Sequence, residues 1–149
     1  MGVEVDVVGF DKLSRRLEQI KMRLPNAVAG TVRAYVELIE RDARMNAPMG
    51  DGDLREAFGT WKRGMLGMVY NSAEHARPIE FGSDPHIITP SQADALAFYW
   101  EKIDQFVVLG SVDHPGHEAF NYFEEAIEKQ WPRLVRDVKK NVNRVLSSV

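Results

Sequence analysis

The chain contains no cysteine in its 149 residues. This absence excludes a disulfide framework, a zinc site built on thiolates and catalysis by a cysteine nucleophile. Because disulfides are typical of oxidising compartments, we expect a protein that is made and used in a reducing cytoplasm, or in a particle assembled there.

Long apolar runs are also missing. No segment approaches the ~18 consecutive apolar residues of a transmembrane helix, and the N-terminus lacks the basic-then-apolar layout of a signal peptide. The chain has no internal repeat and no low-complexity segment. Its 44% apolar and 28% charged residues are ordinary for a globular protein. We therefore predict one domain over residues 1–149 and no membrane partner.

Motifs that indicate catalysis are scarce. There is no phosphate-binding loop with its lysine and no strand-turn-helix nucleophile motif. "DGDLREAFGTWK" begins like a calcium loop with Asp51 and Asp53. Arg55, Glu56 and Lys62 then stand where that loop needs a ligand, a glycine and a bidentate glutamate. We predict that the protein is not an enzyme and uses no cofactor.

Two of the four histidines stand close together in "HPGHE". His114, His117 and Glu118 could ligate zinc. Pro115 and Gly116 lie between the histidines, however, and favour a turn over the rigid helix that carries metalloprotease ligands. We expect no metal here, and loop histidines that contact the backbone. A metal-dependent hydrolase or a metal-stabilised domain stays open as the more distant alternative.

Charge is distributed unevenly along the chain, whose net charge is -3. Residues 45–131 carry a net charge of -8, whereas residues 132–149 carry +4. An acidic middle region should repel nucleic acid. The basic end holds a stripe at helical spacing that could contact DNA phosphates or an acidic partner protein. It could also be a solvated face whose cations favour the end of a helix. The stripe consists of Arg133, Arg136, Lys140 and Arg144.

Hydrophobic periodicity gives the expected elements of the first third of the chain. Alternating valines predict a short strand over residues 3–7. Apolar residues at helical spacing predict a helix over residues 11–24 that stops before Pro25. A second helix should begin at about Asn26 and end at "NAPMGDGD", where proline and glycines favour a turn.

The middle of the chain has the pattern of strands. Two strands are expected over residues 54–61 and 65–71, joined around Gly64. "TPSQADAL" predicts a short helix, with Thr89 as its N-cap and Pro90 in its first turn. "ALAFYW" and "FVVLGSV" then predict a second pair of strands.

A long helix is expected at the C-terminus. Asn121 and Glu124 have the spacing of a capping box at its start, and Pro132 should kink it or split it in two. Its expected apolar face comprises Phe123, Ile127, Trp131, Leu134, Val138, Val142 and Val145. The predicted fold class is α+β, with N-terminal helices and a long C-terminal helix packed on a small antiparallel β-sheet.

Three segments together resemble a known family. "NAPMGDGDLREAF" is similar to an Ala-Pro, spacer, Gly, any residue, Leu-Arg pattern that follows the long helix in small bacteriophage head–tail joining, or tail-completion, proteins of long-tailed phages. "HARPIEFGSDPHIITP" resembles the family's Tyr-Ala, spacer, Val-Glu-Phe-Gly-Thr step, and "VDHPGHEAFNYFEEAI" resembles its His-Pro-Gly turn before the last helix. Their order and spacing agree over about residues 10–148. His75 stands where the family usually has tyrosine, and Asp51 and Ser83 stand where threonine is usual.

The resemblance implies a structural virion protein at the phage neck, without catalysis. Its partners would be copies of itself in a ring, the head-completion or connector proteins, and the tail terminator or tail tube proteins. Genomic DNA would pass through the lumen without specific binding. A tail terminator and, more distantly, a DNA-binding module are the alternatives. The residues implied in structure and assembly are Pro48, Gly52, Leu54, Arg55, Glu80, Phe81, Gly82, His114, Pro115 and Gly116.

The step "IEFG" carries a further expectation. Ile79 and Phe81 should lie on one face of the segment and Glu80 on the other, where it bonds backbone amides or an arginine such as Arg55 or Arg77. A glycine at position 82 allows a backbone angle closed to other residues. We expect the loop over residues 82–90 to be an assembly contact.

Overall fold

The computed structural model describes residues 9–50, 52–91 and 93–149. The fold class is α+β, as predicted. The chain divides into two compact units, each of which is described by itself. Unit 1 consists of Met1–Ala73 and Tyr122–Val149, and unit 2 of Glu74–Asn121. The strand expected over residues 3–7 lies outside the described residues.

One long helix opens the described chain. Helix α1 runs from Phe10 to Asn46 with Pro25 inside it, so the predicted break before Pro25 is wrong. A proline removes one backbone hydrogen bond and crowds the preceding turn. Its ring lies on the exposed side of α1 here, and the helix that follows is held by packing against α4 and the β1–β2 hairpin. That packing outweighs the local cost of the proline.

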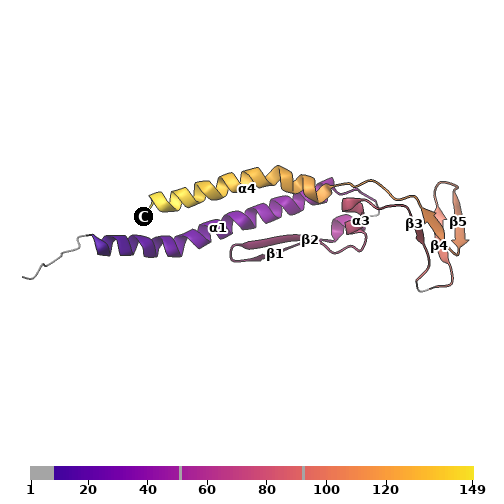
Figure 1. Cartoon of the computed structure of the whole chain (residues 1–149), viewed down its shortest axis with the longest axis horizontal. Coiled ribbons are helices and arrows are strands. Elements are labelled where there is room, and N and C mark those ends of the chain that lie inside the picture. The colour runs from indigo at the N-terminus through magenta and orange to yellow at the C-terminus, as the bar shows by residue number, and fades with distance from the viewer. Residues whose placement is uncertain (1–8, 51, 92) are drawn as a thin grey trace, which may run out of the picture. The chain divides into compact units, whose positions relative to one another are not determined.

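Helix α4, Tyr122–Ser147, lies alongside α1 in unit 1 (Figure 1). It is one helix through Pro132, so the expected split does not occur. The predicted apolar face is partly wrong because Ile127 and Trp131 are exposed. The side chains that α4 buries are Tyr122, Ala126 and Gln130. Asn121, with φ 51, also lacks the extended backbone that is typical of an N-cap.

A hairpin completes unit 1. The prediction of a strand from residue 54 is partly wrong, because a short helix, α2, occupies Asp53–Glu56. Strand β1, Phe58–Arg63, then pairs antiparallel with β2, Leu66–Asn71, around Gly64 at φ 58. The hairpin lies close to α1, because a Cβ built on Gly67 would come 2.3 Å from Cγ2 of Val36.

Unit 2 begins with helix α3, Ala76–Phe81. Strand β3, His86–Ile88, pairs with β6, Val112–His114, and β4, Leu96–Trp100, pairs with β5, Gln105–Leu109. The strands of the described chain therefore form three separate two-stranded antiparallel sheets. The helix predicted from Thr89 is absent from the described part of residues 89–95, which are irregular. A helix this short is marginal without packing, whatever its start signals.

The hydrophobic core is small. Among the described residues, five of the ten buried hydrophobic side chains are alanines, and the largest fully buried side chains are Tyr122 and Gln130. Phe58 contacts Tyr122 and Phe123 at one end of the α1–α4 pair, with ring centroids 5.9 and 5.5 Å away. No helix in the described ranges is both long and apolar enough to cross a bilayer.

Candidate assembly surfaces

Arg55 binds the C-terminal end of α1. Its Nε and Nη2 donate to the carbonyl oxygen of Ala47 at 2.9 and 2.6 Å, and Nη2 also reaches the carbonyl oxygen of Met45 at 3.4 Å. The last carbonyls of a helix have no partner within the helix and carry its negative dipole end. The guanidinium of Arg55 donates hydrogen bonds to these carbonyl oxygens, and its positive charge is favourable at the negative end of the dipole. Arg55 therefore stabilises the C-terminal end of α1.

The rest of the Pro-Met-Gly segment turns the chain from α1 into the hairpin. Pro48 follows the last turn of α1, and Gly52, at φ 100, precedes α2. Leu54 is buried, and its carbonyl oxygen accepts a 2.7 Å hydrogen bond from Nδ2 of Asn71 at the end of β2. The hydrogen bonds of Gly52, Leu54 and Arg55 lie within unit 1, where they hold the turn between α1 and the hairpin.

The other two segments of the family resemblance meet inside unit 2. Ser83 and His117 form an antiparallel bridge in which each backbone N–H donates to the other's carbonyl oxygen at 3.0 Å. The backbone N–H groups of Phe120 and Asn121 donate to the carbonyl oxygens of Ile79 and Glu80 at 3.0 and 3.1 Å. The segments around "IEFG" and "HPGHE" are therefore held side by side by backbone hydrogen bonds, and we call this contact the backbone crossing.

Two glycines permit this crossing. Gly82 has φ 78, and a Cβ there would lie 2.9 Å from the carbonyl oxygen of His117. Gly116 has φ 76, and a Cβ there would lie 2.2 Å from the carbonyl oxygen of Ser83. Both residues have a positive φ, which favours glycine, and a Cβ at either one would clash with backbone atoms of the opposite segment. The expectation of a special backbone angle at Gly82 is confirmed.

The expectation that Ile79 and Phe81 share one face is wrong. Helix α3 turns Glu80 into a buried position with 6% exposure, whereas Phe81 is 71% exposed. Ile79 and Phe81 do not share a face, because residues two apart on a helix point in different directions. Arg55 uses its guanidinium on the end of α1. Phe81, rather than Glu80, is the side chain of this step that is available to a partner.

The histidines of unit 2 contact one another and the backbone. His86 and His114 are opposite each other in the β3–β6 pair, with ring centroids 5.0 Å apart. Nδ1 of His114 accepts a 3.1 Å bond from the N–H of Gly116 across Pro115, which makes the predicted turn. Nδ1 of His117 lies 2.8 Å from the carbonyl oxygen of Glu118. Within the ranges that the structure covers, no group of three or more His, Cys, Asp or Glu side chains could hold a metal ion.

Several side-chain hydrogen bonds cross between α1 and α4, including one from Nδ2 of Asn46 to Glu125 at 3.4 Å. Nε2 of Gln130 donates to Asp42 at 2.6 Å, and the hydroxyl of Tyr35 donates to Asp137 at 2.7 Å. Nδ2 of Asn141 donates to Oγ1 of Thr31 at 2.8 Å. Sequence reasoning missed these pairs. One signal was available in the sequence. Thr31, Tyr35 and Asp42 on α1 are separated by four and then seven residues, and their partners on α4 are separated by seven and then four, as expected for antiparallel helices.

Asp42 is the most deeply buried charge of this set, with 3% exposure. Burial alone would raise its pKa, but hydrogen bonds from Gln130, Lys129 and Arg41 outweigh burial and lower the pKa to about 2. A hydrogen bond from Tyr35 and another from Arg136 also lower the pKa of Asp137. The helix pair is therefore held together by ionised carboxylates with several donors.

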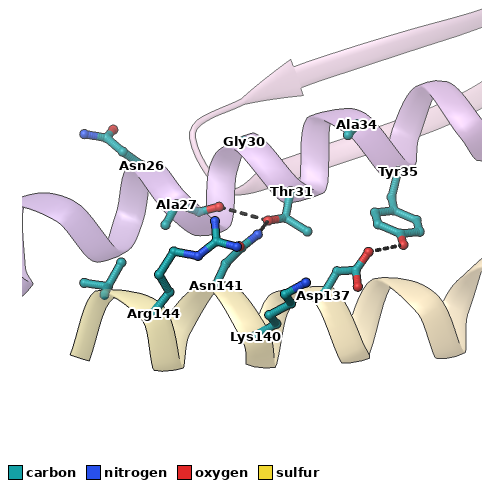
Figure 2. Close-up of a pocket in the computed structure, with 11 residues that line it drawn as sticks. Asn26, Ala27, Gly30, Thr31, Ala34, Tyr35, Asp137, Lys140, Asn141 and Arg144 are labelled. Atoms are coloured by element: carbon teal, nitrogen blue, oxygen red, sulfur yellow. Dashed lines mark hydrogen bonds between the residues drawn. The ribbon is translucent and has the colours of Figure 1, made fainter. Parts of the chain in front are cut away.

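The predicted basic stripe divides in the structure. Arg136 pairs with Asp137 at 3.0 Å, and Arg133 is exposed. Lys140 and Arg144 line a cavity of about 570 Å³ between α1 and α4. Figure 2 shows both side chains extending from α4 toward α1, next to the Asn141–Thr31 bond. Arg133, Arg136, Lys140 and Arg144 therefore do not act as one uniform face, and two of them border a groove with small residues of α1.

Exposed apolar side chains occur on both units. They include Phe10, Leu13 and Leu17 on α1, and Trp61, Met65 and Leu66 on the β1–β2 hairpin. Unit 2 exposes Phe81, Ile87, Tyr99, Trp100, Phe106 and Val108. Exposed apolar patches of this kind mark interaction surfaces in soluble proteins.

No protein-family model, curated protein or solved structure matches the chain significantly. The resemblance to phage neck proteins therefore stays a prediction from the three sequence motifs.

Proposed function

We propose that the protein is a structural subunit of a phage neck, which joins the DNA-filled head to the tail as one copy in a ring-shaped connector. The observation that carries the proposal is the balance of buried and exposed apolar surface. Among the described residues, 23 large hydrophobic side chains are exposed, whereas only five hydrophobic side chains larger than alanine are buried. A chain with this balance completes its core in an assembly.

Unit 2 supports the proposal most directly. Its only buried hydrophobic side chain among the described residues is Ala76. Domains of roughly 40–60 residues are marginal even with a good core, and an isolated two-stranded hairpin is marginal in water. The sequence offers no disulfide to compensate. Partner subunits supply the missing cover.

Charge is consistent with DNA passing through such a ring. Residues 74–121 carry eight acidic and two basic side chains, a net charge of -6. A surface of this sign repels phosphates and lets DNA slide without sticking. The basic groups are concentrated in unit 1, whose net charge is +3.

The deciding experiment is electron microscopy of a lysate from a phage that carries a stop codon in this gene. The proposal predicts full heads beside separate, finished tails. Tails of irregular length would favour the tail terminator instead. Normal particles would contradict both neck functions, and elemental analysis for zinc and salt-dependent DNA binding would then test the hydrolase and the DNA-binding module.

A further inference from the structure

The surface of α1 that faces α4 continues beyond the end of α4. Thr31, Tyr35 and Asp42 bond α4 at spacings of four and seven residues. Because the helices are antiparallel and Thr31 lies opposite Asn141, α4 ends, at Ser147, near the turn of α1 around residue 25. The first four turns of α1 therefore have no α4 residue against them.

This uncovered part of α1 has an apolar stripe at heptad spacing. We name it the α1 seam: Phe10, Leu13, Leu17, Ile20 and Leu24. Phe10, Leu13 and Leu17 are 67%, 55% and 57% exposed. An apolar stripe of this kind on a helix is typically buried against another element.

The charges beside the seam select its occupant. Residues 10–24 carry five basic and two acidic side chains, and Arg16, Lys21 and Arg23 flank the stripe directly. If a second α1 packed on the seam, the arginines and lysines of the two helices would face each other, and their like charges would repel. The C-terminal part of a second α4, residues 132–147, carries +4 and would be repelled in the same way. The occupant should be apolar and acidic.

Unit 2 presents such a surface on the β4–β5 hairpin. Tyr99 is paired with Phe106 and Ala97 with Val108, and we name these four residues the hairpin face. Tyr99, Phe106 and Val108 are 54%, 67% and 64% exposed. The segment from Asp94 to Val108 has three acidic side chains and one basic side chain.

The two surfaces are similar in length. Five residues of a strand span roughly 17 Å. The α1 seam from Phe10 to Leu24 covers fourteen helical steps, about 21 Å. The hairpin can therefore cover most of the seam.

We propose that the hairpin face of one copy docks on the α1 seam of a second copy, with acidic side chains of the hairpin segment beside Arg16 and Lys21. The inference rests on the ring assembly in the proposed function and names its interface. The contact is heterologous, because different surfaces of the two copies meet, so repeated contacts produce a ring when the rotation closes.

The test uses the full chain with two complementary double variants. Tyr99→Ser/Phe106→Ser alters only the hairpin face, and Leu13→Ser/Leu17→Ser alters only the seam. Sedimentation velocity should show an oligomer for the wild type and a monomer for each variant. An equimolar mixture should give a dimer that grows no further, because one intact hairpin face and one intact seam remain. Helical circular dichroism should stay unchanged, since Leu13 and Leu17 precede the part of α1 that bonds α4, and Tyr99 and Phe106 lie on strands.

A charge exchange provides a second test. Arg16→Glu/Lys21→Glu should weaken assembly at least tenfold, and Asp94→Lys/Glu101→Lys in the partner chain should restore it. Three results would overturn the interface: a wild type that is monomeric at its highest soluble concentration, variants that still assemble, or a mixture that stays monomeric. A monomeric wild type beside a lysate of separate heads and tails would reject this interface and leave the neck function standing.

Discussion

The two units of the chain achieve order in different ways. In unit 1, side-chain hydrogen bonds join α1 and α4, and Gly67 lets the hairpin approach Val36 closely. In unit 2, the order comes from the backbone, through the Ser83–His117 bridge and two glycines, while the large apolar side chains face outward. From this comparison we expect unit 1 to be a scaffold that is stable by itself and unit 2 to be completed by partners.

The largest effect is expected at the backbone crossing of unit 2. Gly116→Ala should cost about 3 kcal/mol locally, because its Cβ would meet the backbone oxygen of Ser83 and its φ is positive. Amide hydrogen exchange of the assembled protein should accelerate on the order of a hundredfold around Ser83 and His117, while α1 and α4 keep their rates.

Gly110 provides the matched control within the same unit. A Cβ on Gly110 would meet nothing within 4 Å, and its φ lies outside the left-handed region. Gly110→Ala should leave exchange in both units unchanged. Equal rates for the Gly116→Ala variant and the wild type would show that the crossing does not hold unit 2.

Asp42→Asn tests the side-chain bonds of unit 1 through their pH dependence. The folded pKa of about 2 lies below the usual 3.8, so the ionised form stabilises the fold above pH ~4 and this contribution is lost as pH falls toward 2. The free energy of unfolding of the wild type should exceed that of the variant by about 2 kcal/mol at neutral pH, and this difference, the gap, should disappear near pH 2. Urea unfolding at several pH values measures it. Glu18→Gln, on an exposed face, should show no gap at any pH, and a constant gap for Asp42→Asn would refute the ionic origin.

Arg55→Ala removes the donor at the end of α1 and should cost about 1.5 kcal/mol in the free energy of unfolding. Arg63→Ala, which removes an exposed arginine from β1, should change it by less than about 0.5 kcal/mol. Thermal unfolding of the two variants measures the difference. If they unfold alike, the guanidinium at Ala47 is not what ends the helix.

The smallest effect is expected for Asn141→Ala, at about 1 kcal/mol, because it leaves Thr31 with its other bond to the carbonyl oxygen of Ala27. A double-mutant cycle with Thr31→Ala should give a coupling energy of about 0.5–1 kcal/mol. Strictly additive costs would mean that the two side chains do not act together.

Local patterns predicted part of this architecture. The α+β class, the turn at Gly64, the β4–β5 pair and the start of the last helix follow from periodicity and turn residues, which act over a few positions. The break before Pro25 was wrong because packing of the flanking helix decides the outcome there. The first residues after Gly52 formed a helical turn, since a left-handed glycine and Asp53 begin α2 before the strand starts.

The candidate site was less accessible from the sequence. The glycines at 82 and 116 could be identified as special, but their mutual approach depends on contacts 34 residues apart in the chain. The shared face expected of Ile79 and Phe81 is wrong because "IEFG" alternates like a strand, whereas α3 is a helix. Polar partners such as Tyr35 and Asp137 lie on separate helices, so they can be identified only when the residue spacings of the two helices are compared with each other.

The most direct measurement is amide hydrogen exchange of the wild-type chain, dilute and fully assembled. A partner-dependent unit 2 predicts slow exchange in α1 and α4 under both conditions, and slow exchange over Leu96–Leu109 only in the assembly. Hairpin amides that are equally slow in the dilute chain would show that unit 2 is stable alone, which contradicts the division between scaffold and partner-completed part.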